Sequence, residues 1–271
     1  MLKIKLLFVL IAVVVLTLRT TLADQPSRVF LPMVKAALCV RRGDIAWLDG
    51  RYPDRYDDLE TLCADLFYHS NWALRLDDYL SRGGIPIVWW TPDVLMAKEV
   101  LPVDYDGYLL FANECELSVQ CNESARDVAT MLYDLEAAFP LAKLIGPNFS
   151  DNAVGLGYVD AFVNEYRSLY GKDPAPYRWA IHEYRLGAVD VFCNELNRLS
   201  LGCDGLWVTE YGQCTPKKML PIMDEVWNDN RVERRFYFTN RSGWNIHYCS
   251  ALLDGDELTS VGQAYIEFMT R

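Results

Sequence analysis

The chain has 271 residues, of which 37 are acidic and 26 are lysine or arginine, so its formal net charge is −11 at pH 7. This balance argues against a nucleic-acid partner, because phosphate recognition needs a concentration of basic side chains that no stretch supplies. No Ser/Pro/Gly-rich linker divides the sequence. Because single barrels commonly have this length, we expect one folded domain.

The first 23 residues have the pattern of a secretory signal peptide. The short basic segment Met1–Lys5 precedes the apolar run Leu6–Leu18, and Thr21-Leu-Ala23 has the small residues of a cleavage site. The apolar run is shorter than the about 20 residues needed to span a bilayer, so a permanent anchor is the less favoured alternative. We therefore expect cleavage near Ala23, a secreted domain over 24–271 and no stable membrane association after cleavage.

Short apolar runs alternate with longer segments of helical spacing along the rest of the chain. The clearest expected helix covers Ser124–Phe139, where Val128, Met131, Leu132, Leu135 and Ala138 share one face. Further helices are expected over Gly157–Tyr170, Leu186–Leu199, Thr215–Trp227 and Val261–Met269. The expected strands are Val34–Val40, Leu62–Tyr68, Ile85–Trp90, Tyr108–Asn113, Ala142–Gly146, Arg178–His182, Gly205–Thr209 and Arg235–Thr239.

Strands and helices that alternate in this way predict an α/β fold, the (β/α)8 TIM barrel, as a single domain. The main alternative is an open doubly wound sheet, which usually carries a glycine-rich phosphate turn after its first strand. Here Val40 is followed by Arg41-Arg-Gly-Asp44, without the Gly-x-Gly-x-x-Gly spacing. The barrel is therefore favoured.

Two glutamates come at the ends of apolar strands. Gly205-Leu-Trp-Val-Thr-Glu-Tyr-Gly212 presents Glu210, and Tyr108-Leu-Leu-Phe-Ala-Asn-Glu114 presents Glu114. A carboxylate in such a place is costly to desolvate unless it is paired or used. We therefore expect Glu114 and Glu210 to be a functional pair, whereas Glu116 and Glu183 are expected to be surface charges.

Aromatic and amide side chains also collect at the expected C-terminal strand ends, which meet at one mouth in a barrel. Aromatic faces stack on sugar rings and amides pair with hydroxyl groups, so this composition suits a carbohydrate ligand. Each residue also has a structural interpretation, since a Trp-Trp pair is often core and a lone histidine is often structural. The candidate binding residues are Tyr68, Trp72, Trp89, Trp90, Asn113, Asn148, His182, Tyr184 and Trp244.

A pair of carboxylates on one rim can cleave a glycosidic bond. One acid supplies a proton to the leaving oxygen, and the second carboxylate attacks the anomeric carbon or activates a water molecule. No metal and no other cofactor is required. The three histidines, His69, His182 and His247, lack the His-x-x-x-His spacing of a zinc hydrolase, and the Gly-x-Ser-x-Gly motif of serine hydrolases is absent.

These motifs resemble those of the large clan of retaining (β/α)8 glycoside hydrolases. More narrowly, the chain resembles the Asl1-like catalytic core, which includes glycoside hydrolase family 128, known for β-1,3-glucanases. The matching motifs are Tyr68-His-Ser-Asn-Trp72, Asn113-Glu-Cys-Glu116, His182-Glu-Tyr184 and Thr209-Glu-Tyr-Gly212. Cys115 stands where that group usually has proline, and Trp244 comes later than usual after the eighth strand, so the substrate stays open.

The resemblance implies a role for each matching residue. Glu210 would be the nucleophile, Glu114 the acid/base and Asn113 the partner of the sugar 2-hydroxyl. Tyr184 would orient Glu210, with His182 beside it. Because Glu114 must hold a proton near neutral pH while Glu210 stays ionised, we expect the pKa of Glu114 to be the raised one.

The function expected from these roles is a secreted retaining hydrolase of a polysaccharide or oligosaccharide, with β-glucan as one expected substrate. Trp89, Trp90 and Trp244 are candidate sugar platforms, and the protein is expected to be a monomer. The alternative from another class is a secreted carbohydrate-binding barrel that does not turn over its ligand. A structural wall or surface protein would predict no order in these motifs.

Eight cysteines in an exported chain favour disulfides, and no Cys-x-x-Cys pair suggests a zinc site. Adjacent rim loops and short loop closures favour one of the about 105 possible pairing schemes. For the pair Cys39–Cys63, two buried thiols within strands are an alternative. The expected pairs are Cys115–Cys121, Cys193–Cys203, Cys214–Cys249 and Cys39–Cys63.

Overall fold

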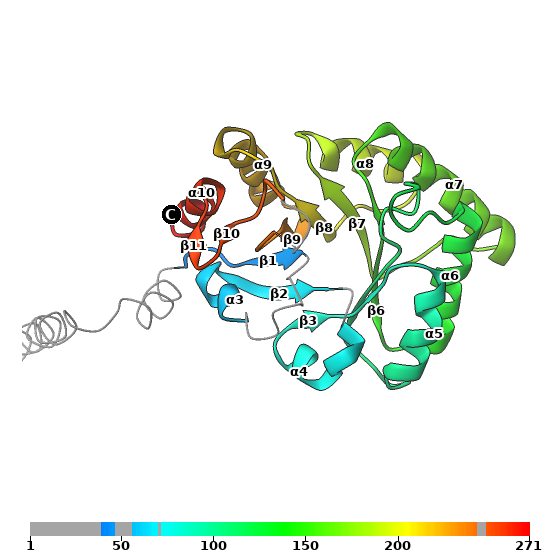
Figure 1. The fold of residues 1–271 in the computed structure, drawn as a ribbon. Coiled ribbons are helices and arrows are strands. Elements are labelled where there is room, and N and C mark those ends of the chain that lie inside the picture. The colour runs from blue at the N-terminus through cyan, green and yellow to red at the C-terminus, as the bar shows by residue number, and fades with distance from the viewer. Residues whose placement is uncertain (1–38, 47–55, 70–71, 243–247) are drawn as a thin grey trace, which may run out of the picture.

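The computed structural model describes residues 39–46, 56–69, 72–242 and 248–271. The expected signal peptide and Trp244 lie outside the described residues. Within the described part, parallel strands form an inner sheet and helices pack around it (Figure 1). The strands of this sheet are β1 (Gly43–Ala46), β2 (Ala64–Tyr68), β3 (Gly84–Ile85), β4 (Ile87–Val88), β5 (Tyr108–Phe111), β6 (Lys143–Phe149), β7 (Arg178–Glu183), β8 (Leu206–Tyr211) and β9 (Val232–Phe238).

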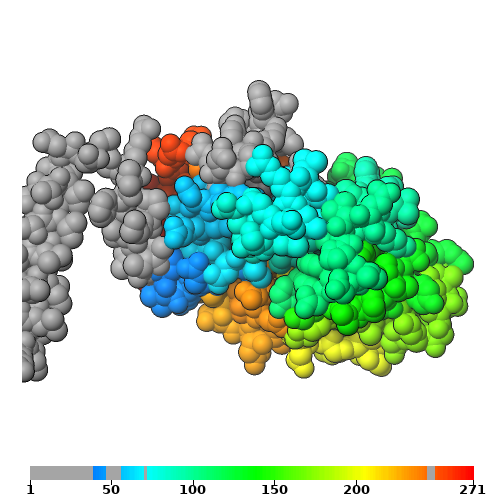
Figure 2. Space-filling model, turned by 90° about the horizontal axis from the view of Figure 1, so that it is seen from below, coloured from blue at the N-terminus to red at the C-terminus, as the bar shows by residue number. Residues whose placement is uncertain are grey.

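The helices form the outer layer (Figure 1), and Figure 2 shows the molecule from below that view, with the cyan to green part of the chain towards the viewer. None of the described helices is long and apolar enough to cross a membrane. A small antiparallel pair, β10 (Leu253–Asp254) and β11 (Glu257–Leu258), precedes the last helix. The helices are α3 (Asp57–Thr61), the 3₁₀ helix η1 (Trp72–Arg75), α4 (Leu76–Ser81), α5 (Thr91–Val100), α6 (Ala125–Ala138), α7 (Ala153–Tyr170), α8 (Ala188–Arg198), α9 (Pro216–Asn228) and α10 (Ser260–Met269).

The sheet closes into a barrel because its two end strands are consecutive in sequence. Its strand order is β3-β2-β1-β9-β8-β7-β6-β5-β4, so the two ends of the order are β3 and β4, which only Pro86 separates in sequence. Proline has no backbone N–H, but the Pro86 carbonyl accepts a hydrogen bond of 2.9 Å from the backbone N–H of Leu110. Since β3 pairs with β2 and β4 with β5, they act as one barrel strand. The expected single-domain (β/α)8 barrel is confirmed.

Helix α6 shows how the sequence pattern becomes a packed element. Ser124 caps its first turn by accepting a hydrogen bond from the backbone N–H of Asp127, and the Asp127 side chain accepts one from the Ser124 backbone in return. Its buried face is the expected one, including Val128, Met131 and Leu132. Burying each such side chain stabilises the fold by about 1.5–3 kcal/mol. The expected helix Ser124–Phe139 is thus confirmed.

The expected first strand, Val34–Val40, lies mostly outside the described residues, and its last two residues, Cys39 and Val40, are not in a strand. The first barrel strand that the structure describes is Gly43–Ala46, in a stretch that no expected element covered. The charge of Asp44 concealed this strand. Its buried carboxylate accepts a hydrogen bond of 3.1 Å from the Leu66 backbone N–H and lies 3.6 Å from the Arg234 guanidinium. Burial raises the pKa of Asp44 to about 7, although the charge of Arg234 opposes the rise.

All four expected disulfides are confirmed. The bonded pairs are Cys39–Cys63, Cys115–Cys121, Cys193–Cys203 and Cys214–Cys249. Two of them lie at the mouth of the barrel: Cys115 directly follows Glu114, and Cys214 follows the strand that carries Glu210. Four disulfides fit an extracellular protein.

Glu183 is not the surface charge that the sequence suggested. Successive side chains of a strand point to opposite faces, so Glu183 faces the helix layer while its neighbour His182 faces the barrel interior. Glu183 is fully buried, and neither carboxyl oxygen has a hydrogen-bond partner among the described residues. Burial and the nearby charge of Glu225 raise the pKa of Glu183 to about 9. Glu116 also departs from the expectation, since it is half-buried and accepts a hydrogen bond of 2.7 Å from the Ser150 backbone N–H.

The raised pKa of Glu183 makes a prediction about stability. The folded protein holds a proton on Glu183 that the unfolded chain releases above its ordinary pKa of 4.5, so this group lowers stability as pH rises from about 4.5 to about 9. We expect Glu183→Gln, which mimics the neutral acid, to raise the free energy of unfolding at pH 8 and to change it little at pH 4.5. Urea unfolding at both pH values measures the effect.

Glu99→Gln is a matched control, because Glu99 is an exposed glutamate of α5. We expect its effect on unfolding to be small and similar at both pH values. A stability gain from Glu183→Gln that is the same at pH 4.5 and pH 8 would contradict a neutral Glu183 in the folded state.

Candidate functional site

Four strands bring a compact polar cluster to the C-terminal end of the barrel. Glu114 follows β5, His182 lies in β7, Glu210 lies in β8 and Tyr68 ends β2. The His182 Nδ1 atom lies 2.9 Å from Glu114 Oε1 and 3.5 Å from Glu210 Oε2. His182 is fully buried, and the two glutamates are 9% and 7% exposed. One imidazole therefore links two largely buried carboxylates.

Two tyrosines hold the carboxylate of Glu210. The Tyr184 hydroxyl donates to Glu210 Oε2 at 2.6 Å, as the family resemblance implied. The Tyr68 hydroxyl donates to Glu210 Oε1 at 2.9 Å and also lies 3.1 Å from the Thr209 carbonyl. Sequence reasoning expected Tyr68 to bind substrate and missed this contact, because a strand-end position does not say which side chains converge across the barrel.

The backbone that carries Glu114 has an unusual conformation. Ala112 and Glu114 have φ angles of 56° and 45°, in the left-handed region that residues other than glycine rarely occupy. The Glu114 backbone N–H donates to the Asn148 carbonyl at 2.8 Å, and the disulfide Cys115–Cys121 closes the loop that follows. Glu114 is thus held from the side of β6 and from its own loop.

The electrostatics of the pair differ from the expectation. Burial raises the pKa of Glu114, but the charge of His182 and its hydrogen bond outweigh burial, so the pKa falls below its ordinary value of 4.5. Burial and the charge of Glu114 raise the pKa of Glu210, against opposing contributions from His182, Tyr184 and Tyr68. The expected order, in which the pKa of Glu114 is the raised one, is wrong, because His182 hydrogen-bonds to Glu114.

His182 is a cation in this arrangement. Burial lowers the pKa of an imidazole, but the negative charges of Glu210 and Glu114 outweigh burial and raise the pKa of His182 to about 9. A positive charge shared between two carboxylates lets both stay close together. The proton that a general acid would need lies on the imidazole, one hydrogen bond away from Glu114.

Several buried polar atoms around this cluster have no hydrogen-bond partner among the described residues. They are Asn113 Oδ1, Asn148 Oδ1 and His182 Nε2. Asn113 and Asn148 are each 1% exposed and form an isolated parallel bridge between β5 and β6. Buried polar atoms without partners are costly, so a ligand rich in hydroxyl groups would satisfy them.

The expected aromatic platforms divide into two groups. Trp90 is 46% exposed, with its indole N–H donating to Asp93 at 2.9 Å, and Trp89 is half-buried. The structure does not bring Trp72 to the mouth: it is 1% exposed, and its indole N–H donates to the Ile87 carbonyl at 2.8 Å. Trp89 and Trp90 can therefore present a ring to a ligand, whereas Trp72 packs in the core.

The described residues offer no group of three or more His, Cys, Asp or Glu side chains that could bind a metal ion.

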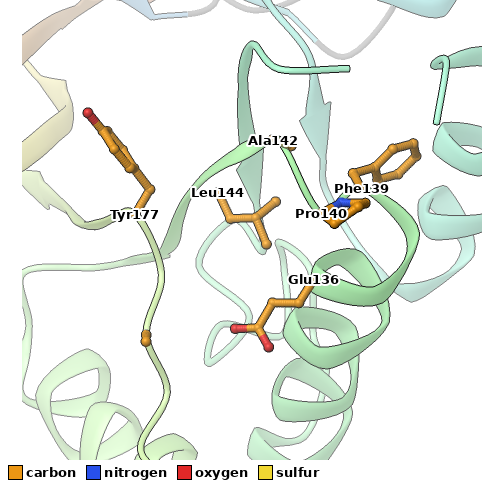
Figure 3. Close-up of a pocket in the computed structure, with 7 residues that line it drawn as sticks. Glu136, Phe139, Pro140, Ala142, Leu144 and Tyr177 are labelled. Atoms are coloured by element: carbon orange, nitrogen blue, oxygen red, sulfur yellow. The ribbon is translucent and has the colours of Figure 1, made fainter. Parts of the chain in front are cut away.

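A cavity of about 260 Å³ lies at the other end of the barrel, where β6 begins (Figure 3). Glu136 and Phe139 at the end of α6 line it together with Leu144. The Glu136 carboxylate already accepts hydrogen bonds from Tyr166 and Lys172, and none of the candidate site residues lines this cavity.

Solved structures share the fold of the chain. An endo-β-1,3-glucanase of glycoside hydrolase family 128 (subgroup II) from Pseudomonas viridiflava is 24% identical, covering 84% of this chain and 97% of its own, with a TM-score of 0.59. A subgroup I endo-β-1,3-glucanase from Amycolatopsis mediterranei, in complex with laminaripentaose, is 18% identical over 83% and 98%, with a TM-score of 0.59. A subgroup VII oligosaccharide-binding protein from Cryptococcus neoformans is 15% identical over 85% and 94%, with a TM-score of 0.60.

At these identities the likeness establishes the fold, and the family follows from the sequence itself. No curated protein matches the chain at a significant level. The family model described as glycosyl hydrolase catalytic core matches residues 56–265, which include β2 to β9 and every described residue of the polar cluster. The expectation of a glycoside hydrolase is thereby confirmed, and the chain belongs to the glycosyl hydrolase catalytic core family.

Proposed function

We propose that the protein is a secreted retaining glycoside hydrolase that cleaves a β-glucan with Glu210 as nucleophile and Glu114 as acid/base. One observation carries this proposal: a single imidazole, His182, lies within 2.9 Å of one carboxylate and 3.5 Å of the other. Two neighbouring carboxyl groups at the ends of different strands can act as the acid and the nucleophile that cleave a glycosidic bond.

The spacing of the carboxylates supports retention of anomeric configuration. Glu114 Oε1 and Glu210 Oε2 cannot be farther apart than the sum of their two distances to His182 Nδ1. This upper limit lies at the lower edge of the about 6.5–9.5 Å that inverting enzymes keep between their carboxyl groups to admit a water molecule. A separation below that limit suits direct attack by Glu210 on the anomeric carbon, and the product configuration decides between the two routes.

The surrounding residues suit the two steps of a double displacement. Tyr68 and Tyr184 hold both oxygens of Glu210 and so fix the direction of its attack. A glycosyl ester then forms on Glu210 as the glycosidic oxygen leaves with a proton from Glu114. In the second step Glu114 takes a proton from water, the water oxygen attacks the same carbon, and the ester bond breaks to release the Glu210 carboxylate. The free Oδ1 atom of Asn113 is available to the sugar 2-hydroxyl throughout.

His182 supplies the proton that Glu114, with its lowered pKa, lacks. The imidazolium donates from Nδ1 to Glu114, so transfer along this 2.9 Å hydrogen bond makes Glu114 an acid. The negative charge of Glu210 is the largest influence that holds the proton on His182. Esterification removes that charge, so nucleophilic attack itself drives the proton towards Glu114 and the leaving oxygen.

The substrate proposal rests on fold relatives and on the mouth. Two of the solved relatives described above are β-1,3-glucanases, one of them in complex with laminaripentaose. Trp89 and Trp90 follow β4 at the mouth, where an indole face can stack on a glucosyl ring. Four disulfides and the signal-like sequence 1–23 support secretion.

The second candidate function is carbohydrate binding without turnover. An oligosaccharide-binding protein with the same fold favours it, because that relative shows that the barrel also serves binding. Both functions predict affinity for glucan oligosaccharides. Only the hydrolase predicts products, and only the hydrolase requires both Glu114 and Glu210.

A polysaccharide panel tests the proposed function. We expect new reducing ends from β-1,3-glucan and fewer or none from mixed-linkage glucan, xylan and mannan. Glu114→Ala should lower kcat on the glucan by about 10²–10⁴-fold, the usual contribution of a general acid. Affinity for laminari-oligosaccharides without products from any polysaccharide would favour the binding protein instead.

Chemical rescue tests the two roles separately. With an aryl β-glycoside and azide, Glu210→Ala should yield the α-glycosyl azide, because azide replaces the nucleophile on the opposite face of the sugar. Glu114→Ala should yield the β-glycosyl azide, because azide then attacks the glycosyl ester on Glu210. NMR of the products gives their configuration. An initial product of inverted configuration from the wild-type protein would exclude the double displacement.

The proposed proton path predicts the titration of His182. Removing the charge of Glu210 should lower the pKa of His182 from about 9 towards neutrality, because the imidazolium loses a neighbouring anion. Nitrogen-detected NMR of Glu210→Gln and of the wild type measures it, with the signal assigned by a His182→Gln variant. Glu183→Gln is the control, since this neutral acid faces away from the site. An unchanged His182 titration in Glu210→Gln would show that the two groups do not share a proton.

A further inference from the structure

The segment Phe111–Glu114 carries the proposed acid, and its conformation is not one that its own sequence favours. None of its residues is a glycine, yet Ala112 and Glu114 occupy the left-handed region. Such a conformation costs on the order of 1–3 kcal/mol per residue and persists only where surrounding contacts impose it. The contacts that impose it identify the residues that position Glu114.

Asn148 in β6 makes most of these contacts. Its side-chain Nδ2 donates to the Phe111 carbonyl at 2.8 Å and lies 3.4 Å from the Ala112 carbonyl. Its backbone N–H donates to the Ala112 carbonyl at 2.8 Å, and its own carbonyl accepts from the Glu114 N–H at 2.8 Å. One residue thus holds all three consecutive peptide groups of the segment Phe111–Glu114.

The approach of β6 to this segment is close in a second place. Gly146 has a φ of 136°, and a Cβ atom there would come within 2.6 Å of the Phe111 carbonyl. The chain therefore uses a glycine to let the Phe111 carbonyl turn towards β6, where the Asn148 amide receives it. The nitrogen of this amide must face the carbonyls, because only the N–H₂ end can donate to them.

We infer that Asn148 is a positioning residue, whose side-chain amide fixes the backbone of Phe111–Glu114 and so aims the Glu114 carboxyl at the leaving oxygen. This inference rests on the proposed function for its catalytic consequence. It differs from the substrate-binding role expected from the sequence, since the donating end of the amide is already committed to the backbone. If the Glu114 carboxyl group is displaced, proton transfer to the leaving oxygen slows, whereas the affinity for substrate stays largely unchanged.

The test compares two variants on two substrates. Asn148→Leu keeps the approximate size of the side chain and removes the amide, and Asn148→Ala removes both. On β-1,3-glucan we expect either variant to lower kcat by about 10–100-fold, which is less than the about 10²–10⁴-fold that complete loss of a general acid costs, with KM changed less than about twofold. On the 2,4-dinitrophenyl glycoside, whose leaving group needs no proton, the rate of glycosyl-enzyme formation should fall much less.

Asn152→Ala is the matched control. Asn152 lies four residues further along and caps α7 by accepting hydrogen bonds from the N–H groups of Val154 and Gly155, without touching the segment. We expect it to lower Tm while leaving the ratio of rates on the two substrates unchanged. Equal losses on both substrates in the Asn148 variants, or a rise in KM with kcat preserved, would overturn the positioning role.

A second measurement tests the geometry without relying on activity. In Asn148→Ala, a displaced Glu114 carboxylate no longer meets His182 Nδ1, so the pKa of His182 should fall from about 9 by about one unit. The other charged groups that face the imidazole, Glu210 and Glu116, are the same in both proteins. An unchanged His182 titration overturns the inference, whereas a wild-type protein that cleaves no glucan overturns only the proposed function.

Discussion

The polar mouth depends on one buried cation between two carboxylates. Glu114 and Glu210 repel each other in a site that water reaches from one side only, and without His182 one of them would have to take up a proton of its own. The imidazolium offsets both charges, while the tyrosine hydroxyls at Glu210 add neutral donors. Because the imidazole is itself fully buried, the two neighbouring carboxylates are what keep its pKa raised. The three groups therefore form a unit that titrates together.

The barrel fixes the positions of the charged groups at the mouth. Tyr68, Glu114, His182 and Glu210 come from four strands that are far apart in sequence, and parallel pairing brings their ends to one rim. Packing behind the rim is rigid, with Trp207 and Phe236 in ring contact at 5.5 Å inside the barrel. Each polar side chain thus stands on a backbone that cannot easily shift. The left-handed segment before Glu114 departs from the regular strand backbone directly at the site.

Much of this was visible in the sequence, and what was missed has a physical cause. Apolar runs and helical periodicity located seven of the barrel strands, because burial on both faces leaves few alternatives for such runs. The strand at Asp44 was missed because a buried charge with partners looks like a loop residue. Glu183 was misjudged for the same reason. The order of the glutamate pKa values was wrong because it depends on which carboxylate the imidazole touches, a distance that motif spacing does not contain.

Pro86 interrupts one barrel strand between β3 and β4, and we call the short contact between β2 and β3 the seam of the barrel. Between β2 and β3 only two residue pairs, Phe67 with Gly84 and Tyr68 with Ile85, join the neighbouring strands before the proline interrupts the ladder. Where few backbone hydrogen bonds hold two strands together, local opening costs the least free energy, and amide hydrogens exchange there first. The seam runs beside Tyr68, which holds the carboxylate of Glu210. Local opening of this strand pair would therefore move the end of β2 and with it the Tyr68 hydroxyl that holds Glu210.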